Sequence, residues 1–444
     1  MSRKRRRRLP PDPFTAPVTD LSHDGRGVAR VGEKVVFVHG ALPGEVVRFQ
    51  ITARRRQYDE GTLLEVLEAA PERVEPRCPH FGVCGGCSLQ HMAPEAQIRR
   101  KQAQLENDLA AIGHVTPETL FPPLTGPVWG YRRKARLGVK HVPKKGKVLV
   151  GFRERGGRYI ADLTTCPVLH PQVGERLEDL SRLVGELSVR DRLPQIEVAM
   201  GDEDAALVFR HLEPLSDADR HLLRAFGEVY GFQIHLQPGG LDSVHRLWPE
   251  EGEPLLAYRH PAFDVTLRFR PTDFTQVNRD INRAMVARAV DLLALTGEES
   301  VLDLFCGLGN FTLPIARHAA QVTGVEGEAG LIERAQANAE ANGIDHAEFH
   351  VADLAEPAAL EAPWANRRYD RILLDPARAG AELLAAHLGR FQAERIVYVS
   401  CNPATLARDA GLITAQGYHL RGAGVMDMFP HTTHVESIAV FERA

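Results

Sequence analysis

The carboxyl-terminal part of the chain, from Thr272 onward, alternates short apolar segments with helical ones. The segments predicted to be strands are 300–304, 320–325, 346–351, 371–374 and 395–399. Strands that alternate with helices form parallel βαβ units, because a crossover must return the chain before the next parallel strand begins. The pattern therefore predicts an open, doubly wound sheet, in which ligands bind at the carboxyl ends of the strands.

The first of these strands runs into a glycine-rich turn, DLFCGLGNF, at residues 303–311. Glycines let the backbone approach a nucleotide-like ligand closely. Glu326 ends the next strand, where a carboxylate can accept both ribose hydroxyls, and Asp353 ends the third, where it can accept from an adenine amino group. A dinucleotide fold expects a third glycine where Thr312 stands, so the pattern favours S-adenosylmethionine, which has no phosphate. A domain for another nucleotide is the alternative.

Two reactive side chains lie near the ends of later strands. Cys401 follows the strand 395–399 in VSCNPATL, and Glu436 lies in DMFPHTTHVE near the C-terminus. Such a cysteine alone is more often a buried structural residue, but beside a cofactor it is placed like a nucleophile. Methylation of uracil at C5 needs both groups, because a thiolate must add to C6 and a base must then remove the C5 proton. We expect Cys401 to be the nucleophile and Glu436 the base.

Four of the six cysteines form a pattern typical of a metal site. Cys78, Cys84 and Cys87 lie in CPHFGVCGGCSLQH, and Cys166 follows in DLTTCPVLH. Three thiolates in one short loop with a distant fourth suit one soft metal centre. The pattern fits either a [4Fe–4S] cluster or structural zinc, although zinc sites more often combine two C-x-x-C pairs and the second pair is missing. C-x5-C-G-G-C-x-x-Q-H with a distant Cys-Pro resembles the cluster motif of the RNA uracil-C5 methyltransferases, and this resemblance implies a [4Fe–4S] cluster. Its expected role is structural or in RNA binding. Cys306, in the glycine-rich turn, is expected to be a packing residue.

Charge is distributed unevenly along the chain. Residues 1–150 contain 26 Lys+Arg and 15 Asp+Glu, whereas the remainder contains 28 and 43, although the whole chain has a formal net charge of only -4. All eight lysines lie between Lys4 and Lys147. A solvated face with a basic tail is one explanation. Because the basic character extends over several segments, a polyanionic partner, nucleic acid above all, is the better one.

The N-terminal and middle regions differ from the carboxyl-terminal part. Residues 14–70 alternate short β-rich runs with glycine and proline, which predicts a small all-β barrel. HDGRGVAR, VFVHGALPGEVV and RRRQYDEG resemble a TRAM domain, an RNA-binding barrel attached to RNA-modifying enzymes; a barrel without a ligand is the alternative. The middle mixes strands whose order cannot be derived, and a helix is predicted for about residues 94–112.

Length and hydropathy place the chain among globular proteins. At 444 residues, with 44% hydrophobic and 25% charged residues, it is long enough for about three domains. No run of about 18 apolar residues occurs, and the basic N-terminus lacks the apolar region of a secretory signal. We therefore expect a cytoplasmic protein without a membrane partner.

Nearly the whole chain resembles the RNA uracil-C5 methyltransferases, and most closely their 23S rRNA branch. The motifs that carry the resemblance are FRPTDFTQVN, DLFCGLGNF, LLDPARAG, VSCNPATLARD and DMFPHTTHVE, with the barrel and the four-cysteine set. The resemblance implies that S-adenosylmethionine is bound by Gln276, Phe305, Asn310, Glu326, Asp353 and Asp375. Gln276 and Asp375 are also implied near the target base.

The expected architecture is a multidomain α/β protein. Its parts are a basic tail (1–12), an OB-like TRAM β-barrel (13–72), a central α+β iron–sulfur RNA-binding domain (73–93 and 126–262) and a Rossmann-like S-adenosylmethionine-dependent methyltransferase domain (94–125 and 263–444). The expected partner is 23S rRNA, and we expect a monomer. Alternatives are methylation of another rRNA site or of tRNA and, in a different class, a non-catalytic RNA-binding ribosome assembly factor.

Overall fold

A computed structural model describes residues 9–444, and the contacts within it divide the chain into two compact units. Among the described residues, the first unit contains residues 9–99, with Arg153–Tyr159 and Pro430–Thr433. Residues 1–8 of the expected basic tail lie outside the described residues. The second contains Arg100–Phe152, Ile160–Phe429 and His434–Ala444. Segment 73–93 therefore belongs to the same unit as the N-terminal barrel. The six-stranded and eight-stranded sheets described below share the second unit.

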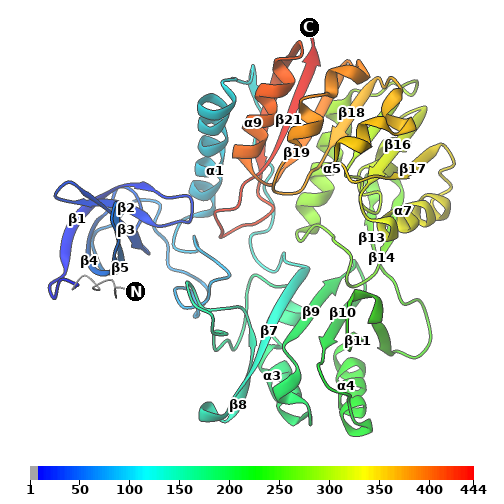
Figure 1. Cartoon of the computed structure of the whole chain (residues 1–444). Helices are drawn as coiled ribbons and strands as arrows, with labels where there is room; N and C mark the ends of the chain where they lie inside the picture. Colours follow the sequence, from blue (N-terminus) through cyan, green and yellow to red (C-terminus); the bar gives the residue numbers. More distant parts are fainter. Residues whose placement is uncertain (1–8) are drawn as a thin grey trace, which may run out of the picture. The chain divides into compact units, whose positions relative to one another are not determined.

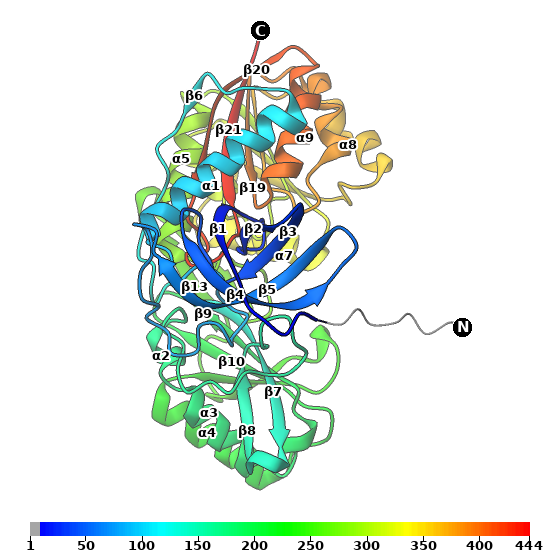
Figure 2. The same ribbon diagram turned by 90° about the vertical axis from the view of Figure 1, so that its left-hand side faces the viewer.

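The first unit contains a closed five-stranded barrel, drawn in dark blue in Figure 2, with the strand order β1-β2-β3-β5-β4. Its strands are β1 (Phe14–Leu21), β2 (Gly27–Val31), β3 (Lys34–His39), β4 (Val46–Arg54) and β5 (Tyr58–Glu68). Alternate side chains point inward, because successive residues of a strand face opposite sides. Val36, Val38, Val47 and Phe49 are buried in this way and form the barrel core.

The second unit contains a six-stranded, mostly antiparallel sheet with the order β12-β11-β10-β9-β7-β8. Its strands are β7 (Lys134–Val142), β8 (Lys147–Gly151), β9 (Gln195–Met200), β10 (Ala205–Arg210), β11 (Gln233–Gln237) and β12 (His245–Trp248). Helices α3 (Leu177–Glu186) and α4 (Asp217–Tyr230) pack on it, as Figure 1 shows. A short helix, α2 (Pro171–Gly174), precedes α3.

The second unit also contains an eight-stranded sheet with the order β17-β16-β15-β18-β19-β21-β20-β6, which is called the catalytic sheet below because the expected catalytic residues lie at its strand ends. They are β6 (Thr119–Leu120), β15 (Ser300–Leu304), β16 (Gln321–Glu326), β17 (Ala347–Val351), β18 (Arg371–Leu374), β19 (Arg395–Ser400), β20 (Tyr418–Met426) and β21 (Glu436–Arg443). The five predicted strands are confirmed as the parallel strands β15 to β19. β21 lies antiparallel between β19 and β20.

Helices accompany this sheet as the doubly wound prediction requires (Figure 1). They are α5 (Arg279–Leu293), α6 (Thr312–Ala316), α7 (Ala329–Ala341), α8 (Glu382–Ala385) and α9 (Pro403–Thr414). The helix predicted near residues 94–112 is α1 (Pro94–Asp108), which continues as a π-helical turn (Leu109–Gly113) packed against α9. Within residues 9–444, no helix has both the length and the apolar character needed to span a membrane.

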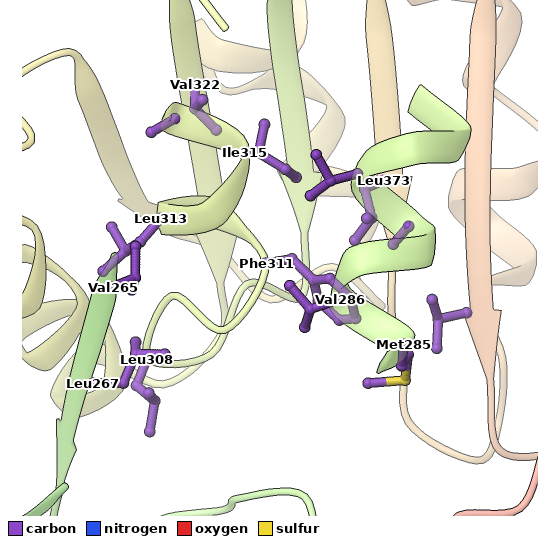
Figure 3. Close-up of a cluster of buried hydrophobic side chains, with 14 of the residues drawn as sticks. Val265, Leu267, Met285, Val286, Leu308, Phe311, Leu313, Ile315, Val322 and Leu373 are labelled. Atoms are coloured by element: carbon purple, nitrogen blue, oxygen red, sulfur yellow. The ribbon is translucent and has the colours of Figure 1, made fainter. Parts of the chain in front are cut away.

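A hydrophobic cluster fixes the glycine-rich turn between β15 and α6. Leu308, Phe311 and Leu313 flank the turn and are at most 3% exposed. They pack in one cluster with residues of α5 and of the hairpin formed by β13 (Leu256–His260) and β14 (Val265–Phe269), as Figure 3 shows. Because close-packed side chains resist displacement, the turn has a fixed position at the carboxyl end of β15.

Candidate active site

The strand register brings the predicted nucleophile and the predicted base together. Ser400 of β19 pairs with Ser437 of β21 in an antiparallel ladder. Cys401 is the next residue after β19, and Glu436 is the first residue of β21. The two therefore lie across from each other at the same end of the sheet, close enough for the charge of Glu436 to raise the pKa of Cys401.

Asp375 lies at the same end of the sheet. It directly follows β18, the strand beside β19, and its backbone N–H donates to the carbonyl of Leu304 at 3.3 Å. Its charge raises the pKa of both Cys401 and Glu436, which shows that the three side chains share one environment. Burial raises the pKa of Asp375 itself to about 7.

Burial controls the protonation of these groups, because it disfavours the charged form of each. Burial, with the charges of Glu436 and Asp375, raises the pKa of the Cys401 thiol to about 11. Glu436 is 3% exposed, and burial with the charge of Asp375 raises its pKa to about 8, while Lys101 lowers it. The thiol is therefore protonated at neutral pH in the protein alone, and the carboxyl titrates near neutrality.

The glycine-rich turn contains backbone conformations that leave room for a ligand. Gly307 and Gly309 have φ of +57° and +98°, and Phe305 has φ of 66°, which is strained for a residue with a side chain. The Phe305 N–H donates to the Val325 carbonyl at 2.9 Å, which holds this conformation. A Cβ added at Gly307 would meet no atom within 4 Å, so open space lies beside the turn.

Glu326, the predicted ribose ligand, is fixed against this turn. Its Oε2 accepts from the Gly307 N–H at 3.2 Å, and its Oε1 accepts from the Gly327 and Glu328 N–H groups at 2.7 and 3.2 Å. Asp353 lies nearby on the neighbouring strand end, because the Ala352 N–H donates to the Glu326 carbonyl at 2.9 Å. Asp353 is exposed. The open turn with two carboxylates at adjacent strand ends fits an adenosine moiety.

Asn310 is held in a network within the protein. Its Oδ1 accepts from Tyr258 Oη, His260 Nε2 and Asn282 Nδ2 at 2.9, 3.0 and 3.0 Å, and its Nδ2 donates to Asn282 Oδ1 at 3.0 Å. Gln276 lines a small cavity with Tyr258 and Asn282. The structure therefore connects Asn310 and Gln276 through shared neighbours, and the Asn310 side chain anchors the turn.

Two buried residues near the site were not predicted as site residues. Asp303 is fully buried beneath the turn, its Oδ2 accepts from Thr312 Oγ1 at 2.5 Å, and burial raises its pKa to about 7. Its place at the start of DLFCGLGNF is a signal that could have identified it. Lys101 is 3% exposed and pairs with Asp427. No local pattern indicates Lys101, because its partner is 326 residues away.

The predicted cluster ligands are divided between the two units. Cys78, Cys84 and Cys87 lie in the first unit and Cys166 in the second, and all four are half-buried. Backbone contacts order the loop: the Cys78 N–H donates to Gln90 Oε1 at 3.1 Å and the Cys84 N–H to the His80 carbonyl at 2.9 Å. In the part of the chain that the structure describes, no group of three or more His, Cys, Asp or Glu side chains is arranged to hold a metal ion.

Comparison with known families gives two matches within the chain. Residues 262–444 match the family described as tRNA (Uracil-5-)-methyltransferase. Residues 14–64 match the TRAM domain, which confirms the assignment of the barrel. The two matches cover most of the barrel and all strands of the catalytic sheet except β6, and they leave the six-stranded sheet unassigned.

Full-length relatives are similar over almost all of the chain. Proteins called 23S rRNA (uracil(1939)-C(5))-methyltransferase RlmD from Alcanivorax borkumensis and Alkalilimnicola ehrlichii are 55% and 56% identical over 440 and 441 residues, which is 99% of each chain. Among solved structures, the tRNA (uracil-54, C5)-methyltransferase of Pyrococcus abyssi in complex with S-adenosyl-L-homocysteine is 26% identical, with a TM-score of 0.74. It covers 96% of this chain and 100% of its own.

Proposed function

Because this chain belongs to the tRNA (uracil-5-)-methyltransferase family, we propose that it methylates C5 of uridine 1939 in 23S rRNA with S-adenosylmethionine as the methyl donor. The observation that carries the proposal is the juxtaposition of Cys401 and Glu436 across β19 and β21, at the end of the sheet where Asp375 also lies. A nucleophile and a base at one strand end suit C5 methylation and have no role in a non-catalytic assembly factor.

The residues of this chain divide the reaction into steps. The Cys401 thiol gives up its proton to solvent and its sulfur adds to C6 of the uracil. The electron pair of the C5–C6 double bond then forms an enolate with the C4 carbonyl, which makes C5 nucleophilic. When bound, S-adenosylmethionine supplies the electrophilic methyl group that C5 takes from the sulfonium. The Glu436 carboxylate then takes the C5 proton, the double bond re-forms, and the bond from sulfur to C6 breaks to return the thiolate.

The turn and the strand ends would hold the cofactor. Phe305 and Gly307 present the open side of the turn, while Glu326 and Asp353 supply acceptors for the hydroxyl and amino groups of an adenosine. We propose Asp375 and Gln276 as the residues between cofactor and target base, since Asp375 shares its environment with Cys401. Asn310 would act by fixing the turn.

The test is covalent trapping with rRNA that contains 5-fluorouridine, because fluorine at C5 cannot leave as a proton. We expect the full-length protein with cofactor to form a stable protein–RNA adduct and Cys401→Ala to form none. With ordinary rRNA, Glu436→Gln should accumulate adduct and release little product. Glu442→Gln is the matched control, because Glu442 lies at the other end of β21 and is part-exposed. Absence of an adduct from the unaltered protein would overturn the mechanism.

The target position is tested separately. We propose uridine 1939 because the full-length relatives are named for that position, whereas the protein from Pyrococcus abyssi is named for uracil 54 of tRNA. Mass spectrometry of 5-methyluridine in rRNA and tRNA from a strain without the gene identifies the site. We expect 5-methyluridine to be lost at position 1939 of 23S rRNA alone, and its loss from tRNA would contradict this assignment.

We further propose that the enzyme acts in the cytoplasm as a monomer. Light scattering of the purified protein checks the oligomeric state.

We also propose that Cys78, Cys84, Cys87 and Cys166 bind a [4Fe–4S] cluster whose role is structural or in RNA binding. The support is the chemistry of the donor set, four thiolates with three of them in one ordered loop. No step of methyl transfer passes through it. Anaerobically purified protein should contain about four iron and four sulfide per chain, and Cys87→Ser should lose both. Zinc without sulfide would contradict the cluster.

A further inference from the structure

A single buried lysine lies behind the predicted base. Lys101 is on α1 and is 3% exposed, although lysine is almost never fully buried unless it is paired. No lysine follows Lys147 in the sequence, so the catalytic sheet receives this ammonium group from a segment that precedes the central sheet. A buried ammonium group must be stabilised by partners in its surroundings.

The surroundings of Lys101 are defined by three contacts. Its Nζ donates to Asp427 Oδ1 at 2.7 Å and to the Phe429 carbonyl at 3.0 Å. The Asp427 N–H in turn donates to the Leu124 carbonyl at 2.8 Å. Asp427 is the first residue after β20, whose last residue, Met426, pairs with Glu436. The ion pair therefore lies next to the strand position that carries the base.

The ionisable groups around Glu436 are mostly acidic. Asp375 and Cys401 face it from the ends of β18 and β19, and ionisation of either disfavours the carboxylate. His434 lies two residues before it, and burial together with Arg378, Lys101 and Arg132 lowers the pKa of that imidazole, which favours its neutral form. Among the described residues whose charge acts on Glu436, Lys101 is the one cation, and it lowers the pKa of Glu436.

We propose that Lys101, held by Asp427, is a positioning residue that favours the ionised form of Glu436, the form that can take the C5 proton. The proposal rests on the proposed function of Glu436 as the base. A cation in a low-dielectric site stabilises a neighbouring carboxylate more strongly than it would in water. Without it, a larger fraction of Glu436 is protonated at neutral pH, and a protonated carboxyl cannot accept the C5 proton.

The alternative is that the ion pair only joins α1 to the catalytic sheet. A purely structural pair would lower activity by the same factor at every pH, because it would change the amount of folded enzyme. A positioning role predicts a loss that disappears at high pH, where Glu436 ionises without help. The pH dependence of adduct breakdown therefore separates the two roles.

The experiment uses the full-length protein and an rRNA fragment, with single-turnover product release measured from about pH 6 to 10. In Lys101→Gln, the midpoint of the rise in product-release rate should shift to a pH about one unit higher, so that release at pH 7 is about tenfold slower. The maximal release rate at high pH should be unchanged. Lys101→Arg, which keeps the charge, and Asp427→Asn, which keeps the cation, should show no upward shift. Adduct formation with 5-fluorouridine rRNA should survive in all three variants, because trapping precedes the base step.

The possible outcomes are distinguishable. If the unaltered protein forms no adduct, the proposed function fails whatever Lys101 does. If it forms the adduct and Lys101→Gln shows an unshifted profile, the Lys101 proposal is overturned and the chemistry stands. Should Lys101→Gln unfold, as thermal melting would reveal, the double variant Lys101→Gln/Asp427→Asn takes its place, because it leaves no unpaired buried charge. An unshifted profile in that double variant would overturn the Lys101 proposal.

Discussion

Three carboxyl groups lie at the carboxyl end of the catalytic sheet: Asp303 and Glu436 are buried, and Asp375 is half-buried. Burial raises the pKa of Asp303 and Asp375 to about 7 and, with the charge of Asp375, that of Glu436 to about 8. A carboxyl whose pKa is higher in the folded than in the unfolded state binds protons more tightly when folded. Its contribution to stability is complete below the unfolded value of about 4 and is lost as pH rises toward 8.

Replacing Glu436 should therefore stabilise the protein in alkaline solution. We expect Glu436→Gln to raise the melting temperature at pH 8 and to change it little at pH 5, because the amide removes a charge that burial disfavours. The free energy of unfolding at pH 8 should rise by an amount on the order of 1–3 kcal/mol. Fluorimetric melting curves of the cofactor-free protein at both pH values measure it, with Glu442→Gln as the control. An equal change at both pH values would contradict the assigned pKa.

Cofactor affinity should depend on the charge of Glu326. Its carboxylate accepts three backbone hydrogen bonds and would accept the ribose hydroxyls. Glu326→Gln keeps the size but replaces one acceptor oxygen with a donor, so we expect S-adenosylhomocysteine to bind at least about tenfold more weakly. Calorimetric titration measures this. Glu382→Gln, on α8 and exposed, is the control, and unchanged affinity in Glu326→Gln would remove Glu326 from the cofactor site.

At the scale of elements, the π-helical turn that follows α1 touches α9 through a residue without a side chain. A Cβ at Gly113 would lie 2.3 Å from the Ala407 carbonyl oxygen, and one at Gly411 would lie 2.9 Å from the Gly113 carbonyl oxygen. The two elements therefore approach backbone to backbone. This contact holds the end of α1, and with it Lys101, against the helix that starts two residues after Cys401.

Gly113→Ala should force α1 away from α9. We expect a loss of about 1–3 kcal/mol in unfolding free energy, because an added methyl group in a packed contact must displace backbone. Urea unfolding measures it. Gly185→Ala on α3 is the matched control, since its Cβ would meet its nearest atom at 4.0 Å and alanine favours helices. Equal stability of the two variants would show that the contact can relax.

Sequence patterns predicted the elements of the catalytic sheet well because buried parallel strands form continuous apolar runs. β15 and β18 have the predicted bounds, and the other three differ by one residue. β6 could not be predicted, because Thr119 and Leu120 are exposed and its assignment depends only on the free edge of β20. The order of the six-stranded sheet was equally inaccessible, since antiparallel pairing in that sheet depends on long-range contacts.

Site residues were predictable where a strand end supplied the signal. Cys401, Glu436 and Asp375 stand directly at strand ends, and the strand register places these candidate residues at the same end of the sheet. The network around Asn310 was not predictable, because Tyr258 and His260 belong to the β13–β14 hairpin and have no motif in common with the turn. Lys101 required the folded structure for the same reason.

At the scale of the whole molecule, we expect the basic residues of segment 1–150 to contribute to the affinity for RNA. Arg56 is exposed in the loop between β4 and β5 of the barrel. We expect Arg56→Ala to weaken rRNA binding and to reduce the salt dependence of the affinity by about one unit of slope, as loss of one phosphate contact does. Binding isotherms at several salt concentrations measure it. Arg182→Ala, exposed on α3, is the control, and equal effects would argue against the barrel.

The late pairing of Lys101 with Asp427 also constrains how the protein is made. The two residues are 326 positions apart, and at about 5–20 residues per second the ribosome needs on the order of tens of seconds to synthesise the chain between them. Until Asp427 has been synthesised, Lys101 has no carboxylate with which to pair, and β6 cannot yet pair with β20. The nascent catalytic sheet therefore stays incomplete until β20 and β21 have been synthesised.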